Sequence, residues 1–333
     1  MNLSQNLQRV GGAHHEIRQP ARPSIVPANG LRSALLMIAA GRRERALDLA
    51  LLLPVIGLLA AFLFYPLLYG LDLSINRTEG FEVTGSAGLE HYARALLGDA
   101  VFRQGLANSL VFTAAAVVLQ TGLGLLLAVL VAETRRGQSL FRVVFVAPFV
   151  LAPVAAGTVW KFMYAPFFGI VPSVGNLLGV DVSSVAPLAD PGTALWAIVL
   201  AFAWRFAGFS MVVYLAAMRS IPRELYEYGE LEGIGRFTRL RRITWPLLWP
   251  QTFALTLLTT IATLRVFDLV WIMTAGGPGH ATETVSTYVY ATAFRSLNVG
   301  YAQAMATILM VVIVALAIIE YRLLNRRAED VSG

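Results

Sequence analysis

Among the charged side chains within long apolar stretches of this 333-residue chain, Lys161, Arg205, Arg265 and Asp268 are the candidates for a function. A charge in an apolar, membrane-like environment is costly, so such a residue usually has a function, a partner or a route to a polar boundary. Arg265 and Asp268 are three residues apart, a spacing at which two side chains of one helix can form an ion pair. Structural pairing is therefore the simplest interpretation of these two, and a side chain extended to the membrane surface is the simplest for Lys161.

Two tryptophans directly precede two of these cations, since Trp160 stands before Lys161 and Trp204 before Arg205. A pyranose has apolar C–H faces as well as hydroxyl groups, so sugar sites combine aromatic rings with charged or amide groups. The residue types therefore predict a substrate path formed by Trp160, Lys161, Trp204, Arg205 and Asp268.

Other chemistry lacks the residues that it requires. The chain has no cysteine, and all four histidines lie outside the apolar stretches, so neither a nucleophile–base pair nor a metal triad is expected within them. His280 and Glu283 are too few to hold a metal, and like His14 and His15 they are expected to be solvated. No G-x-x-x-x-G-K-[ST] loop is present to bind ATP phosphates. We therefore predict that the chain is not an enzyme and has no cofactor.

Composition indicates the environment of these residues. Hydrophobic residues make up 57% of the chain and charged residues 14%, whereas soluble domains carry charge at about a quarter of their positions. Apolar blocks of 18 or more residues are typical of membrane-spanning helices. The sequence predicts an all-α, polytopic membrane protein with six transmembrane helices, at about 49–71, 106–132, 140–164, 194–218, 250–273 and 304–323.

Arginines beside these spans predict their orientation. Fifteen arginines lie before span one, between spans two and three, between spans four and five, and at or after the end of span six. The alternate loops hold four. By the positive-inside rule both termini face the cytoplasm. The arginines flank apolar blocks and form no stripe with aromatics, so the net charge of +6 does not indicate nucleic acid.

The predicted spans divide the chain into three regions. Residues 1–45 form a cytoplasmic tail with a short apolar segment, 31–40, that is too short to cross and is expected along the membrane surface. This tail has no h-region, so it is not a signal peptide. Residues 46–325 form the transmembrane domain, and 326–333 a cytoplasmic C-terminal tail.

One predicted cytoplasmic loop, 219–249, is long and densely charged. Pro222 can start a helix, and Glu224 and Glu227 place negative charge near its N-terminus, where the helix dipole favours it. Gly233 and Gly235 favour a break. A second short helix is expected before Pro246 and Pro250.

Apolar residues in the first of these helices point to a partner. Leu225, Tyr226 and Tyr228 stand among its charged residues. Exposed apolar side chains on a charged helix favour docking into a groove, although an ordinary solvated loop remains the alternative.

The same segment resembles the signature loop of binding-protein-dependent ABC importer permeases, E-A-A-x-x-D-G-A followed by a spaced I-x-L-P. Glu227, Glu232, Gly233, Ile243 and Pro246 stand at matching positions. The chain differs from this pattern at Tyr228, Gly229, Ile234 and Trp245, and in having glutamate in place of the aspartate. The run from Ile221 to Glu227 resembles the carbohydrate branch.

Further short motifs extend the resemblance over about residues 45–325. They are Gly88–Tyr92 with Asn108–Leu110, residues 137–148, Gly157–Lys161, Phe267–Asp268 with Thr274–Pro278, Ala293–Phe294, and Tyr301–Ala302. In this order they are similar to the maltose and glycerol-phosphate type of permease, whose fold is the type I ABC importer fold.

The resemblance implies a set of partners and a site. It implies a second permease subunit in a heterodimer, two ATP-binding subunits, an extracytoplasmic solute-binding protein and membrane lipid, in a bacterial or archaeal cytoplasmic membrane. The ATP-binding subunit would hold the helix that ends at Gly233 in a cleft. The implied coupling residues are Glu224, Glu227, Glu232, Gly233 and Pro246. His280 and Glu283 would then contact the solute-binding protein, and the cargo would be a sugar or polyol.

An ion-gradient-driven secondary transporter for a small polar solute is the alternative function. Such transporters often contain inverted repeats and buried carboxylates. Residues 45–165 and 190–325 share no repeat beyond their hydrophobicity, and a proton relay would need more buried carboxylates than Asp268. An ion channel is less favoured because no ring of pore charges is visible.

Overall fold

The computed structural model describes residues 51–134, 136–166, 168–177 and 186–332. The predicted cytoplasmic tail, its segment 31–40 and the histidine pair lie outside these residues. The chain forms two compact units, Met1–Tyr65 and Pro66–Gly333. In the first, residues 51–65 are described and are helical, with a π-helical turn, η1, at Ala60–Phe64.

Helices dominate the described residues, as predicted. Four of them are long and apolar enough to cross a membrane: Leu51–Ser74, which ends in α2 (Tyr65–Ser74), α4 (Ala100–Glu133), α8 (Ala194–Arg219) and Val299–Leu323 within α15 (Val299–Ser332). Two bent pairs add a fifth and sixth span if each is counted once. The described part of the chain therefore holds four to six candidate spans, and the predicted number of six is consistent with this range.

The third predicted span is bent rather than straight. It consists of α5 (Gln138–Val150) and α6 (Pro153–Met163), whose axes differ by 100°. Leu151 and Ala152 between them are extended, with ψ of 138° and 140°. Proline disfavours the helical conformation in the residue before it, so α5 cannot continue through Ala152. Proline is tolerated in the first turn of a helix, so Pro153 can begin α6.

The fifth predicted span, 250–273, is wrong at its C-terminal end. Helix α12 (Trp249–Leu264) stops before Arg265, and a separate short helix, α13 (Asp268–Met273), follows. The chain leaves α12 in a tight turn in which the N–H of Val266 donates to Thr263 O at 3.0 Å. Arg265 and Asp268 consequently do not share one helix.

The remaining described elements are short. A hairpin of β1 (Asn76–Glu79) and β2 (Glu82–Ser86), which the sequence did not predict, follows α2. The others are α3 (Glu90–Ala93), η2 (Arg94–Gly98), α7 (Ile170–Leu177), α9 (Arg223–Leu231), α10 (Arg236–Arg239), η3 (Leu240–Thr244), α11 (Trp245–Leu247), α14 (Val285–Tyr290) and η4 (Ala291–Arg295).

Close packing of α8 against its neighbours forms the centre of the second unit. A Cβ at Gly124 of α4 would lie 2.3 Å from Ser210 Cβ of α8, and a Cβ at Gly208 would lie 1.9 Å from the carbonyl oxygen of Phe145 in α5. Gln120 Nε2 donates to Ser210 Oγ at 3.0 Å. Small residues and interhelical hydrogen bonds of this kind hold helices together where lipid supplies no hydrophobic drive.

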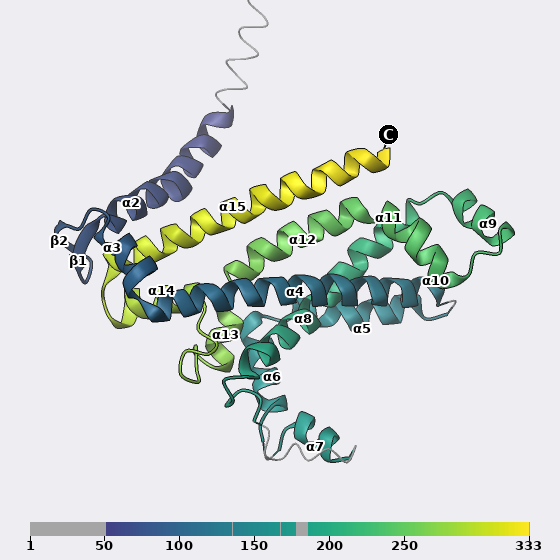
Figure 1. Cartoon of the computed structure of the whole chain (residues 1–333), viewed down its shortest axis with the longest axis horizontal. Coiled ribbons are helices and arrows are strands. Elements are labelled where there is room, and N and C mark those ends of the chain that lie inside the picture. Colours follow the sequence, from purple (N-terminus) through teal and green to yellow (C-terminus); the bar gives the residue numbers. More distant parts are fainter. Residues whose placement is uncertain (1–50, 135, 167, 178–185, 333) are drawn as a thin grey trace, which may run out of the picture. The chain divides into compact units, whose positions relative to one another are not determined.

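The long helix α4 connects two polar regions that lie at its opposite ends. In Figure 1, α9 and α10 lie beyond its C-terminal end, and α14 and the β1–β2 hairpin lie near its N-terminal end. Glu133 forms ion pairs with α10 at one end, and Asp99 accepts a hydrogen bond from Tyr288 of α14 at the other. At 1.5 Å per residue, the helix separates the two regions by about 50 Å, more than the thickness of a bilayer's hydrocarbon core.

Candidate functional site

The charged loop folds as two short helices separated by a turn, as predicted. Helix α9 begins at Arg223, directly after Pro222, and ends at Leu231. Helix α10 begins at Arg236 and continues through η3 and α11, which contains Pro246. The break falls at Gly233, which has a left-handed φ of +71°.

Gly233 closes α9 with a Schellman motif. Its N–H donates to Glu230 O at 3.0 Å, and the N–H of Ile234 donates to Gly229 O at 2.9 Å. The two bonds satisfy carbonyl groups that a helix end would otherwise leave without partners. The left-handed conformation favours glycine, so this turn depends on the residue type at position 233.

The two halves of the loop pack on one another through Gly229. This glycine is buried, and a Cβ on it would lie 3.1 Å from Ile243 Cδ1 and 3.8 Å from Ile234 Cδ1. The hydroxyl groups of Tyr226 and Thr244 are 3.3 Å apart and make a second connection. Tyr226 is therefore half-buried and faces the second half of the loop, contrary to its expected place among exposed docking residues.

The outer surface of the loop combines apolar and acidic side chains. Leu225, Tyr228 and Leu231 are 40%, 68% and 85% exposed. Glu224, Glu227 and Glu232 are exposed too, and none of them has an ion-pair partner among the described residues. The loop thus presents apolar area and free negative charge together.

Glu133, at the C-terminal end of α4, holds this loop, although no sequence motif marks it. Its carboxylate accepts from Arg236 Nη1 at 3.2 Å and lies 3.8 Å from Arg239 Nη2. Arg239 also pairs with Glu230 at 3.1 Å. Exposed ion pairs contribute little individually, but a shared network fixes orientation. Glu133 and Arg236 are 103 positions apart, so no local sequence pattern predicts that they pair.

Two of the predicted substrate-path residues lie together. The ring of Trp160 in α6 meets that of Trp204 in α8 edge to face, with centroids 5.6 Å apart. Trp160 is buried, and its Nε1 has no hydrogen-bond partner among the described residues. Trp204 is 37% exposed.

The two cations of the predicted path bind backbone carbonyl groups. Arg205 donates to Leu151 O from Nη2 at 2.9 Å and from Nε at 3.3 Å, at the bend between α5 and α6. Lys161 Nζ donates to Ile272 O of α13 at 3.3 Å. A cavity of about 670 Å³ lies beside it, lined partly by Phe162, Tyr164 and other apolar residues.

Asp268 does not form the expected pair with Arg265. No ion pair within 4.0 Å joins these two described residues, because the helix that would align them ends at Leu264. Helices α6, α8 and α13 share one hydrophobic cluster, which includes Trp160, Phe202 and Val270.

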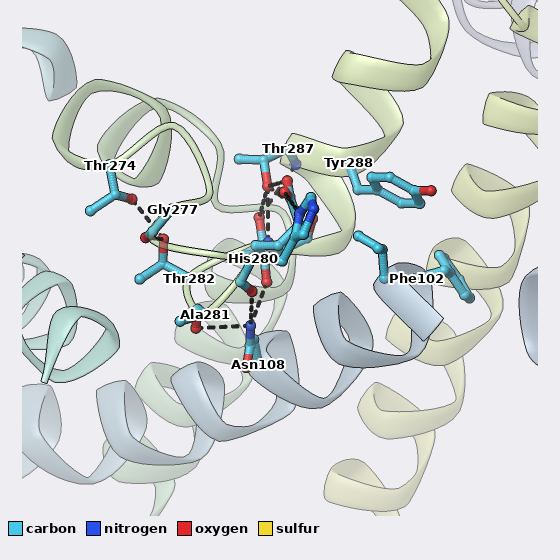
Figure 2. Close-up of polar contacts among 12 residues, drawn as sticks. Phe102, Asn108, Thr274, Gly277, His280, Ala281, Thr282, Thr287 and Tyr288 are labelled. Atoms are coloured by element: carbon cyan, nitrogen blue, oxygen red, sulfur yellow. Dashed lines mark hydrogen bonds and ion pairs between the residues drawn. The ribbon is translucent and has the colours of Figure 1, made fainter. Parts of the chain in front are cut away.

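The loop between α13 and α14, at the opposite end of α4, is tightly bound (Figure 2). Asn108 Nδ2 of α4 donates to the carbonyls of His280, Ala281 and Glu283, at 3.3, 3.1 and 2.9 Å. The Glu283 carboxylate accepts from Thr287 Oγ1 at 2.7 Å and lies 2.9 Å from His280 Nδ1.

The prediction that Glu283 is solvated is wrong. Its side chain is 7% exposed, whereas that of His280 is 53% exposed. A Cβ at Gly276 would lie 2.5 Å from Glu283 Oε2, so the glycine leaves room for the carboxylate. Within this loop, His280 is therefore a group that a second protein could reach, and Glu283 is a structural one.

Asp99 caps α4 at the same end. It accepts from the N–H groups of Val101 and Phe102 at 2.9 and 3.0 Å, and from the phenols of Tyr288 and Tyr301 at 2.8 and 2.7 Å. Partial burial would raise the pKa of Asp99, but these hydrogen bonds to the ionised form outweigh it and hold the pKa below the ordinary 3.8. The cap therefore joins α4, α14 and α15 through one carboxylate.

These features define a helical membrane subunit with a bound loop at each end of its central helix. The chain belongs to the family of binding-protein-dependent transport system inner membrane components, whose model matches residues 120–330. It is thus a membrane-embedded transport component, as the resemblance of its loop implied.

Individual relatives cover most of the chain. A probable ABC transporter permease protein of Pyrococcus horikoshii is 32% identical over 78% of this chain and 89% of its own length. The sn-glycerol-3-phosphate transport system permease protein of Agrobacterium fabrum is 31% identical, over 85% and 96%. The lactose transport system permease protein of Rhizobium radiobacter is 31% identical, over 80% and 90%.

A solved structure shares the fold. A crystal structure of a bacterial ABC transporter involved in the import of the acidic polysaccharide alginate contains a chain that is 23% identical. It aligns over 87% of this chain and 99% of that one, with a TM-score of 0.75.

Proposed function

We propose that this subunit forms half of the translocation pathway of an ATP-driven, binding-protein-dependent importer of sugars. A second permease subunit would form the other half, and a solute-binding protein would deliver the cargo. The phosphate-binding residues that ATP hydrolysis needs would belong to two separate ATP-binding subunits. Relatives named for glycerol phosphate and lactose transport, together with the fold of the alginate transporter, support a carbohydrate cargo.

The geometry of the loop between α8 and α12 carries this proposal. Its α9 surface presents exposed apolar side chains with free glutamates, while Glu133 and the Gly233 turn fix its conformation. An ordered, exposed, amphipathic helix on a fixed base suits docking in a groove of a partner. In the proposal, Glu224, Glu227 and Glu232 contact the ATP-binding subunit, Gly233 keeps the turn, and Pro246 starts the connection to α12.

Orientation follows from the same proposal. The loop at Glu133 would face the cytoplasm and the loop at Asn108 the outer side, with both termini inside. Fifteen arginines beside the cytoplasmic ends of the spans support this direction. His280, exposed in the outer loop, would then be within reach of the solute-binding protein.

For the cargo we propose a path along Trp160, Lys161, Trp204, Arg205 and Asp268. The edge-to-face pair of tryptophans would offer apolar ring area. Lys161 of α6, Arg205 of α8 and Asp268 of α13 would offer polar partners for hydroxyl groups, since these three helices share one hydrophobic cluster. Lys161 and Arg205 both donate to backbone carbonyl groups and do not converge on one point, as the cations of a phosphate-binding site do. We therefore propose a neutral sugar or polyol as the substrate, and not a phosphorylated one.

Reconstitution of the assembled importer in proteoliposomes tests the driving force. We expect sugar uptake to require ATP and the ATP-binding subunits, and to persist when an ionophore collapses ion gradients. Uptake by this chain without those subunits, abolished by the ionophore, would show an ion-gradient-driven transporter and refute the proposal.

The same preparation tests the path through Trp204. Replacement of Trp204 by alanine should raise the sugar concentration needed for half-maximal uptake. Trp196→Ala is the matched control, since it removes a 53% exposed tryptophan of the same helix outside the path. Equal effects of the two replacements would remove Trp204 from the path.

A further inference from the structure

A basic cavity of about 510 Å³ lies beside Glu133, where the end of α4, the start of α5 and the end of α8 meet the loop of α9 and η3. Five arginines contribute to its lining: Arg142, Arg219, Arg223, Arg236 and Arg239. Glu133 is the one acidic residue of the lining, so the formal excess is four positive charges.

Acidic partners account for two of these arginines. Arg236 pairs with Glu133, and Arg239 pairs with both Glu133 and Glu230. Within the described residues, no carboxylate lies within 4.0 Å of Arg142, Arg219 or Arg223. Three guanidinium groups of one cavity are thus left without a counter-charge from the protein.

Arg142 gives an independent indication of a missing partner. Its Nη2 donates to Gln138 Oε1 at 3.3 Å, whereas its Nε is buried and has no hydrogen-bond partner. A buried donor without an acceptor is unfavourable, and such groups are rare in native structures. An acceptor that enters the cavity would remove this cost.

We infer that this cavity binds a phosphate-bearing anion. Guanidinium forks match the oxygens of a phosphate in two-point geometry, and several arginines together can neutralise a charge of more than one. The apolar side chains of Leu215, Met218 and Leu240 also line the cavity and suit the carbon part of such a ligand.

Two sources could supply this chemistry. Basic pockets between transmembrane helices at the cytoplasmic side bind the head groups of anionic phospholipids, and the proposed orientation places the cavity at that side. A soluble phosphorylated compound would use the same groups. In both cases the ligand would contact the loop through Arg223, Tyr226 or Arg239. It would contact α4 through Val129 and Ala132, and α5 through Arg142. Binding would therefore stabilise the loop against the helices.

The test uses the full-length chain purified in a neutral detergent, with native mass spectrometry as the measure of binding. Phosphatidylglycerol and inorganic phosphate are the two probes, and zwitterionic phosphatidylcholine is the control lipid. We expect saturable binding of one phosphatidylglycerol, one phosphate or either, with phosphatidylcholine bound at least about tenfold more weakly.

Paired variants assign that binding to the cavity. Arg142→Gln with Arg219→Gln should weaken it about tenfold or more, because each replacement removes a charge-assisted donor. Arg241→Gln with Arg242→Gln is the matched control: these arginines are exposed residues of the same loop region outside the cavity, so we expect less than about a twofold change.

A second pair of variants, Arg142→Lys with Arg219→Lys, distinguishes loss of the binding groups from misfolding, because it keeps both positive charges. It removes the two-point geometry of both guanidinium groups, so we expect a several-fold loss of binding. Binding of phosphatidylglycerol alone would identify a lipid head group, and binding of phosphate that displaces the lipid would identify a soluble ligand. Equal losses in the glutamine pairs, or no binding of either probe, would overturn the inference. The assay contains neither ATP nor sugar, so its result does not depend on the proposed transport function.

Discussion

Replacement of Gly233 tests the coupling role most directly, because the structure separates its backbone requirement from its packing. Gly233 has a φ of +71°, and a Cβ built on it would meet no atom within 4 Å. An alanine there would thus cost only the left-handed conformation, about 1–2 kcal/mol. That cost would reduce the population of the closed turn by a factor of about 5 to 30.

Gly235, two residues away, is the matched control. It has a φ of −65° and also has open space around the position of a Cβ. Gly235→Ala should therefore leave the turn intact or slightly stabilise it, since alanine restricts the unfolded chain. Gly233→Asn should lie near the wild type, because asparagine tolerates the left-handed region.

Proline at position 233 is the extreme case. Its φ is fixed near −65°, and it lacks the N–H that Gly233 donates to Glu230 O. The turn cannot close, so we expect Gly233→Pro to abolish transport while the protein still inserts in the membrane.

Sugar uptake by cells that depend on the variant importer measures the effect, and the amount of full-length, monodisperse protein extracted from membranes measures insertion. Co-purification of the ATP-binding subunits shows whether the turn affects docking. We expect uptake to decrease in the order wild type, Gly233→Ala, Gly233→Pro. Normal uptake by Gly233→Pro, or equal losses in Gly233→Ala and Gly235→Ala, would refute the reasoning.

Two further predictions concern stability. Gly208→Ala should lower the midpoint of thermal denaturation in detergent, because its Cβ would lie 1.9 Å from Phe145 O and overpacking costs about 1–3 kcal/mol. Gly122→Ala is the control, since a Cβ at Gly122 would meet no atom within 4 Å, and it should leave the midpoint unchanged. Equal midpoints of the two variants would contradict this explanation. Asp99 has a lowered pKa in the folded protein, so its stabilising contribution is complete above the ordinary value of 3.8 and is lost as pH falls through the folded pKa. The difference in denaturation midpoint between wild type and Asp99→Asn should thus be constant near neutral pH and shrink below about pH 4, and a difference independent of pH would exclude this role.

Features that depend on local sequence were predictable. Apolar length alone predicted the number of spans, since a bilayer requires about 20 apolar residues whatever their partners are. The turn at Gly233 was predictable as well, because its two hydrogen bonds join residues no more than five positions apart.

Predictions that assumed one continuous helix failed. Arg265 and Asp268 have the correct spacing for a pair, but α12 ends one residue before Arg265. The bend between α5 and α6 was also missed, although Pro153 indicated it, because hydrophobicity does not distinguish a straight span from a broken one.

The sequence by itself therefore determined that the chain is a membrane protein, how many spans it has, and where its charged loop turns. Only the tertiary structure decided that Glu133 holds this loop, that Asn108 binds the loop between α13 and α14, 172 or more positions away, and that Glu283 is buried. Apolar length and backbone preference act on neighbouring residues and can be read along the chain. Ion pairs and burial depend on which distant segments pack together, and no single stretch of sequence contains that information.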